Sequence, residues 1–98
     1  MALQELIASL QAQRVLQSPH IREALQKVDR KKFVPDEYAA FAYDDTPLPI
    51  GEGQTVSQPY TVAFMLELLK PKYGDHIVDI GSGSGWQTGL LAELVGSQ

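Results

Sequence analysis

The chain has 98 residues, a formal net charge of −4, and 44% hydrophobic and 20% charged residues. This balance is typical of a globular domain, and the acidic charge argues against a nucleic-acid partner, which requires a basic surface. The chain contains no cysteine, which excludes disulfides and thiolate metal sites. His20 and His76 lie far apart in the sequence, and no metal site is expected. The sequence shows no bilayer-spanning apolar run and no signal-peptide pattern, so we expect a cytoplasmic protein without a membrane partner.

Residues 1–43 are predicted to form an N-terminal helical segment. Residues 2–17 carry apolar side chains at Leu3, Leu6, Ile7 and Leu10, then at Val15 and Leu16, and the first four follow helical spacing. Ser18 can cap a second helix, and Pro19 suits the first helical position. This helix should end before Phe33-Val34-Pro35, because the residue before a proline disfavours the helical region. A short piece over 36–43, rich in alanine and aromatic residues, is predicted to follow.

The basic residues of this segment gather near the end of the second predicted helix. They are Lys27 and the run Arg30-Lys31-Lys32. Cations at a helix C-terminus are favoured by the helix dipole. We therefore interpret the cluster as a solvated helix end and not as a binding patch.

Residues 44–98 are predicted to begin with a hairpin, since closely spaced prolines and glycines exclude a long helix. Two short extended pieces, near 46–50 and 54–56, should fold back around Gly51 and Gly53. Ser57 is then predicted to cap a third helix that has Pro59 in its first turn and ends at Pro71. That helix is apolar on most sides, so we expect it to be well buried.

The most informative pattern lies further along the chain, where a predicted buried strand over 76–80 runs into alternating glycines. Residues without a Cβ let the backbone approach a ligand closely, and the helix predicted over 86–95 directs its first N–H groups to the same place. Gly81, Gly83 and Gly85 do not match the dinucleotide fingerprint, which needs two residues before its third glycine. A tight strand-to-helix turn without any ligand is the alternative.

A strand that is apolar on both faces requires neighbouring strands and covering helices. The chain ends at Gln98, where a second strand of such a fold would begin. We therefore expect the sequence to be the front part of a larger domain.

Taken together, these segments resemble the protein-L-isoaspartate O-methyltransferase family from residue 20 onward. The hairpin and its flanks are the specific part, because generic methyltransferases lack that arrangement. The matching motifs are Arg30-x-x-Phe33-Val34-Pro35, Tyr43-x-Asp45-x-Pro47-Leu48-Pro49-Ile50-Gly51, Gln54-Thr55-Val56-Ser57-Gln58-Pro59, Met65-x-Glu67-Leu68-Leu69 and Asp79-Ile80-Gly81-Ser82-Gly83-Ser84-Gly85.

The resemblance implies an α/β fold, namely the N-terminal part of a Rossmann-like class I S-adenosylmethionine-dependent methyltransferase. Such a part would be helix-rich, with a short β-hairpin and the first parallel strand. The implied cofactor is S-adenosylmethionine, and the implied substrates are isoaspartyl-containing proteins or peptides. The methyl ester would cyclise to a succinimide that hydrolyses partly back to aspartate. A carboxylate is already ionised at neutral pH, so this transfer requires no strong general base.

The resemblance also assigns roles to particular residues. Ser57 matches the active-site serine, and a plain helix cap is its alternative. Asp45, Ile50 and Val56 join Ser57 on the substrate side, although a turn-stabilising aspartate and hydrophobic packing would also explain them. The predicted cofactor residues are Gln54, Thr55, Asp79, Gly81, Ser82, Gly83, Ser84 and Gly85. Trp86 is interpreted as a packing residue.

One departure from the family is length, because the acidic residue for the ribose hydroxyls belongs beyond Gln98. We therefore expect a truncated and inactive N-terminal part that either associates with itself through an unpaired strand or depends on a missing C-terminal portion. Two other hypotheses remain open. The first is a non-catalytic, self-associating binding module of the same fold, and the second is a methyltransferase for another carboxylate or small molecule.

Overall fold

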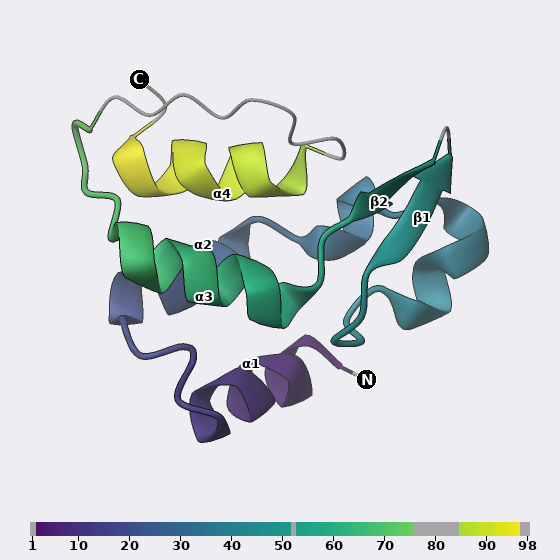
Figure 1. Cartoon of the computed structure of the whole chain (residues 1–98), viewed down its shortest axis with the longest axis horizontal. Coiled ribbons are helices and arrows are strands. Elements are labelled where there is room, and N and C mark those ends of the chain that lie inside the picture. The colour runs from purple at the N-terminus through teal and green to yellow at the C-terminus, as the bar shows by residue number, and fades with distance from the viewer. Residues whose placement is uncertain (1, 52, 76–84, 97–98) are drawn as a thin grey trace.

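Helices make up most of the chain in the computed structural model, which describes residues 2–51, 53–75 and 85–96 (Figure 1). In chain order the elements are α1 (Leu3–Ala12), α2 (Pro19–Lys27), the 3₁₀ helices η1 (Arg30–Phe33) and η2 (Asp36–Phe41), the strands β1 (Leu48–Gly51) and β2 (Gln54–Val56), and the helices α3 (Pro59–Leu69) and α4 (Trp86–Val95).

The central element is α2, which contacts α1, α3 and α4. Its apolar face is formed by Ile21, Ala24 and Leu25, and all three side chains are buried. Figure 1 shows α4 on one side of the α2–α3 pair and α1 on the other. The hydrophobic core therefore lies around α2. Helices from both the 1–43 and the 44–98 segments contribute to it.

The helix starts predicted for the N-terminal segment are confirmed, and the four apolar residues predicted at helical spacing all lie in α1. Ser18 is the N-cap of α2, and Pro19 occupies its first position. The first helix ends at Ala12, because Arg14 adopts a left-handed backbone with φ 61°. Val15 and Leu16 lie beyond that turn and are buried. Val15 and Leu16 therefore pack in the core from the connection after α1, which is why they do not follow the helical spacing of the apolar residues before them.

The hairpin also forms where the sequence predicts it. β1 and β2 pair antiparallel, with Leu48 opposite Val56, and the register shifts between Pro49 and Gly51. Gly51 and Gly53 have φ of 101° and 74°, values that residues with a Cβ adopt rarely. Within the described ranges this two-stranded antiparallel sheet is the β structure, and no parallel strand is present there. The predicted parallel strand over 76–80 lies outside the described residues.

The prediction that the third helix is well buried is wrong for one face of α3. Val62, Ala63 and Leu66 are buried against the core. Phe64 and Leu68, however, are 51% and 72% exposed. Residues four apart share a helix face, so these two form an apolar stripe, and no part of the described chain covers it. The sequence correctly predicts that the helix is apolar on this face. Burial also requires another segment to cover that face.

A carboxylate from α3 holds the start of α2. Glu67 accepts hydrogen bonds from the amides of Gln17 and Ser18, both at 2.8 Å, and from the Ser18 hydroxyl at 2.8 Å. Partial burial by itself would raise the pKa of Glu67. The hydrogen bonds and the nearby Lys70 outweigh it and lower the pKa below its usual value. The ionised carboxylate therefore stabilises the fold.

This contact predicts an acid-dependent loss of stability. Because the folded-state pKa is lowered, the contribution is complete above the ordinary value of 4.5 and disappears as the pH falls through the folded-state pKa. Glu67→Gln should reduce the free energy of unfolding by about 1 kcal/mol at pH 7. Its difference from the original chain should shrink below about pH 4. Urea unfolding at stepped pH measures this, with the exposed Glu23→Gln as the control, and a pH-independent difference would contradict it.

Candidate functional site

The side chain that organises the predicted site is Arg30, which is 1% exposed. Its Nη1 donates to the carbonyls of Ala42 at 2.8 Å and Asp44 at 3.1 Å. Its Nη2 donates to the carbonyls of Thr46 at 2.6 Å and Ser57 at 3.1 Å. Ala42, Asp44 and Thr46 precede the β-hairpin and Ser57 follows it, so one guanidinium holds both ends of the hairpin.

The same guanidinium lies over the ring of Trp86, 5.4 Å from the ring centroid. Trp86 is the first residue of α4 and is 2% exposed. Its indole N–H donates to the Val28 carbonyl at 3.1 Å. Burial and these contacts agree with its interpretation as a packing residue. Arg30 thus connects the segment around the hairpin to the beginning of α4.

The interpretation of the basic cluster as a solvated helix end is therefore wrong for Arg30. Lys27, Lys31 and Lys32 are exposed, as that interpretation requires. Position 30 differs because α2 ends at Lys27 and the tighter turn of η1 begins at Arg30. The sequence signal that could distinguish Arg30 from the neighbouring lysines is the motif Arg30-x-x-Phe33-Val34-Pro35, in which two apolar residues follow the arginine closely.

Electrostatics around Arg30 reflect its burial. Burial lowers the pKa of Arg30 to about 10, and the carboxylates of Asp45 and Asp44 act in the opposite direction. The side chain is therefore still cationic at neutral pH. Next to it, Tyr43 donates to Asp29 Oδ1 at 2.6 Å. Burial, followed by this hydrogen bond, raises the pKa of Tyr43 to about 12, so Tyr43 is protonated and fixes the same loop a second time.

Ser57 lies between the hairpin and α3 and is half-buried. The prediction that it caps this helix is wrong, because α3 begins at Pro59 and its N-cap is Gln58. Gln58 is the last residue with an extended backbone, and Pro59 is fixed in the first helical position. The role of Ser57 at an active site stays a prediction.

Asp45 supplies the missing cap. Its Oδ1 accepts the amide of Tyr60 at 2.8 Å, and its carbonyl accepts from Gln58 Nε2 at 3.2 Å. A carboxylate at a helix N-terminus is favoured by the helix dipole. Asp45 therefore connects the loop before the hairpin to α3. This contact agrees with the alternative interpretation of Asp45 as a residue that stabilises a turn. Substrate binding by Asp45 stays a prediction.

The remaining hairpin residues of the predicted site differ in exposure. Gln54 and Thr55 are exposed on β2, where a ligand can reach them. Ile50 is half-buried, and Val56 is 0% exposed in the core. Val56 thus packs in the core, in agreement with the alternative that this residue serves hydrophobic packing.

Of the glycine turn, the structure describes Gly85. It has φ 87° and is the N-cap of α4. A Cβ at Gly85 would lie 3.6 Å from the Phe33 ring, so Phe33 of the Arg30 motif lies against the end of the turn. The left-handed backbone itself disfavours any side chain at this position. The other predicted cofactor residues in this part of the chain lie outside the described residues: Asp79, Gly81, Ser82, Gly83 and Ser84.

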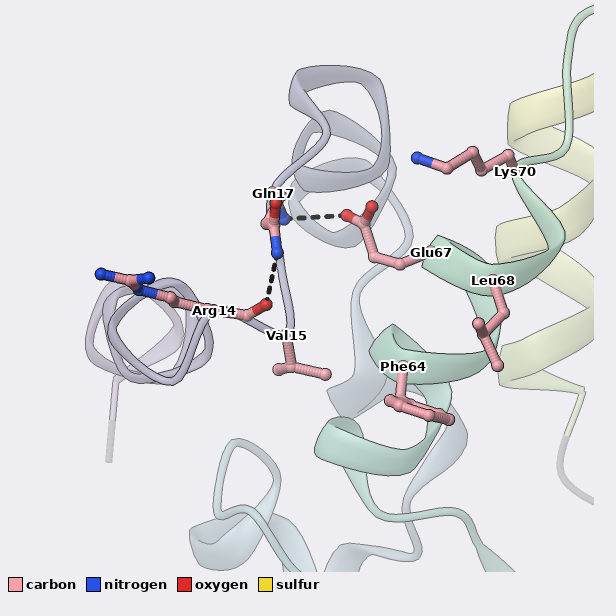
Figure 2. Close-up of a pocket in the computed structure, with 7 residues that line it drawn as sticks. All are labelled: Arg14, Val15, Gln17, Phe64, Glu67, Leu68 and Lys70. Carbon is pink, nitrogen blue, oxygen red and sulfur yellow. Dashed lines mark hydrogen bonds between the residues drawn. The ribbon is translucent and has the colours of Figure 1, made fainter.

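The structure also contains a cavity of about 260 Å³ on another part of the surface (Figure 2). It lies between the α1–α2 connection and α3, and Figure 2 shows Glu67 at one side and Phe64 and Leu68 along α3. Among the described residues, none of the predicted site residues lines it: the lining residues are Arg14, Val15, Gln17, Phe64, Glu67, Leu68 and Lys70.

The described residues offer neither a cluster of metal ligands nor a membrane-spanning helix. No three His, Cys, Asp or Glu side chains among them could hold a metal ion together. None of the described helices has the length and apolarity needed to cross a membrane.

Comparison with known proteins identifies the family. The model of the family Protein-L-isoaspartate(D-aspartate) O-methyltransferase (PCMT) matches residues 1–98. The chain belongs to this family. A protein-L-isoaspartate O-methyltransferase of Ignicoccus hospitalis is 46% identical over 94 residues, which are 96% of this chain and 44% of that protein. One from Petrotoga mobilis is 55% identical over 75 residues, or 76% of this chain and 35% of its own.

Solved structures of the family share this fold. A crystal structure of such a methyltransferase from Plasmodium falciparum, in complex with S-adenosyl-L-homocysteine, matches with a TM-score of 0.86 at 28% identity. The match covers 98% of this chain and 43% of that protein. The fold is therefore that of the N-terminal part of the family, and the chain spans less than half the length of these relatives.

The capping role of Asp45 gives a stability prediction. Asp45→Ala removes the acceptor for the Tyr60 amide and should lower the free energy of unfolding by about 1 kcal/mol. Asp45→Asn keeps an acceptor and should lower it by about half as much. Urea denaturation checks this, with the exposed Glu37→Ala as the control. An Asp45→Ala chain as stable as the original would show that the contact does not stabilise α3.

Proposed function

We propose that this chain forms the N-terminal part of an enzyme that transfers a methyl group from S-adenosylmethionine to the carboxylate of L-isoaspartyl residues in damaged proteins. Family membership supports the proposal, as does the S-adenosyl-L-homocysteine bound to the similar protein of Plasmodium falciparum. The observation that carries it is the shared contact with Arg30. The Ser57 carbonyl and the Trp86 ring both contact this guanidinium, so the proposed active-site serine is near the helix that follows the glycine turn.

The chemistry requires positioning more than acid–base groups. The cofactor supplies a methyl group on a positively charged sulfur. As the substrate carboxylate attacks, an oxygen–carbon bond forms, the sulfur–carbon bond breaks, and both charges disappear without any proton transfer. A site that excludes water lowers the barrier to such a charge-neutralising step, and a fixed in-line geometry adds to the effect.

We assign the roles within the chain on the same basis. The Ser57 hydroxyl orients the substrate carboxylate, Asp45 and Ile50 shape the substrate side, and the buried Val56 supports that side from the core. Gln54 and Thr55, which are exposed on β2, face the cofactor together with Asp79 and the glycine turn over 81–85. The start of α4 suits glycine at position 85, because residues with a Cβ rarely adopt its left-handed backbone and a Cβ there would face the Phe33 ring.

Methyl transfer from labelled S-adenosylmethionine to an isoaspartyl peptide tests the proposal. Because the relatives are more than twice as long, we expect little transfer by the 98 residues alone. A chain lengthened with the C-terminal portion of a relative should transfer methyl groups. In that longer chain Gly83→Val should abolish transfer and Ser57→Ala should reduce it by about 10- to 100-fold. Ser9→Ala is the matched control, and unchanged transfer in both site variants with an intact fold would contradict the assignment.

The peptide itself separates this function from methylation of another carboxylate. An isoaspartyl peptide should compete with the labelled substrate, whereas the same peptide with a normal aspartyl residue should not. Equal competition by the two peptides would favour a less specific carboxylate methyltransferase.

A second candidate function, a self-associating module, is favoured by the apolar face of α3. Phe64, Leu68 and Leu69 are 51%, 72% and 51% exposed, and exposed apolar patches mark interaction surfaces. We predict that the 98-residue chain self-associates at micromolar concentrations in sedimentation velocity. Phe64→Glu should shift it toward the monomer. Phe41→Glu, at a residue 49% exposed on η2, is the matched control and should not. A well-folded monomer would remove this candidate.

A further inference from the structure

Arg30 lies between the two parts of the chain that the proposed function assigns to substrate and cofactor. We propose that Arg30 is a positioning residue that fixes the Ser57 segment relative to the first turn of α4. Through it, the order of one segment depends on the order of the other. This inference rests on the proposed function for its purpose, but its physical content is a coupling that can be measured without activity.

On the substrate side, every hydrogen bond of the guanidinium goes to the backbone. The acceptors are the carbonyls of Ala42, Asp44, Thr46 and Ser57, which lie 12, 14, 16 and 27 residues from Arg30. These bonds close the base of the hairpin and fix the path of the main chain that leads into Ser57. They do not depend on which side chains the segment carries.

On the cofactor side, Arg30 and residues close to it in the sequence contact the beginning of α4. The guanidinium covers one face of Trp86, and the Val28 carbonyl holds the indole N–H of the same ring. Phe33 lies against Gly85 and Gly89. Residues on both sides of Arg30 therefore hold the beginning of α4, and any displacement of η1 changes both segments.

Only an arginine can make this set of contacts with one side chain. Its planar guanidinium offers five N–H donors in a fixed fork and stacks on an aromatic ring at the same time. A lysine at position 30 would keep the charge, but its single ammonium cannot donate to four separated carbonyls and also cover the ring. Arg30→Lys is therefore the informative substitution, because it separates the geometry from the charge.

Hydrogen exchange in the 98-residue chain measures the coupling at two reporters. One is the Tyr60 amide, which is bonded to Asp45, and the other is the indole N–H of Trp86, the single tryptophan of the chain. Arg30→Lys should accelerate exchange at both by about tenfold or more, while amides of α1 change by less than about twofold. Lys31→Met, exposed in the same turn, should change neither. Equal acceleration throughout the chain would show a general loss of stability and overturn the proposal.

A double substitution separates coupling from two independent effects. Trp86→Phe keeps an aromatic ring but removes the indole. In the original chain it should accelerate exchange of the distant Tyr60 amide, and in the Arg30→Lys background it should add no further acceleration. Independent, multiplicative effects on Tyr60 exchange would overturn the coupling. Because Trp86→Phe is a conservative substitution, this double-substitution experiment gives a result even where a larger truncation of Trp86 prevents folding.

Activity in the lengthened chain supplies the last readout. Arg30→Lys should lower kcat by about tenfold or more with the KM for S-adenosylmethionine changed by less than about twofold, because the cofactor residues are retained and their alignment with Ser57 is lost. A wild-type kcat in Arg30→Lys would overturn the positioning role. Absence of transfer in the lengthened original chain would instead contradict the proposed function, and the exchange experiment would still decide the coupling.

Discussion

The buried guanidinium of Arg30 is the interaction on which the arrangement of this chain depends. Removing a cation from water is unfavourable, and here four backbone carbonyls and the face of Trp86 compensate for the hydration lost at the two Nη atoms, whereas the buried Nε has no hydrogen-bond partner in the described part of the chain. The hairpin has only a short antiparallel ladder of its own, over Leu48–Gly51 and Gln54–Val56. A two-stranded ribbon of this length is marginal by itself, so the contacts at its base determine where it lies.

Carboxylates from distant segments extend the same principle to the helix termini. The N-caps Ser18 and Gln58 make no capping hydrogen bond through their own side chains. Glu67 and Asp45 supply acceptors for the amides at these ends instead. Each such contact joins two elements while it satisfies a helix terminus, so α2, α3 and the loop before the hairpin are held together by polar contacts as well as by apolar packing.

The outer face of α3 is apolar and exposed in the described part of the chain. Phe64 and Leu68 are exposed, whereas the opposite face of the helix is fully buried. The relatives contain more than twice the length of this chain, and the structural match covers nearly all of it. The fold of the N-terminal part is therefore well formed around α2, while the apolar face of α3 remains available to further polypeptide.

The sequence alone determined the local elements, because their signals act over a few residues. Proline and serine mark the start of α2, and Gly51 and Gly53 permit the positive φ of the hairpin turn. The tertiary structure alone decided that Arg30 is buried while Lys31 and Lys32 remain in solvent, and that Asp45 rather than Ser57 holds the start of α3. The acceptors of Arg30 lie 12 to 27 residues away and come together only when the chain folds. A charge or a carboxylate in a sequence specifies what it can bind, and the fold decides which partner comes within reach.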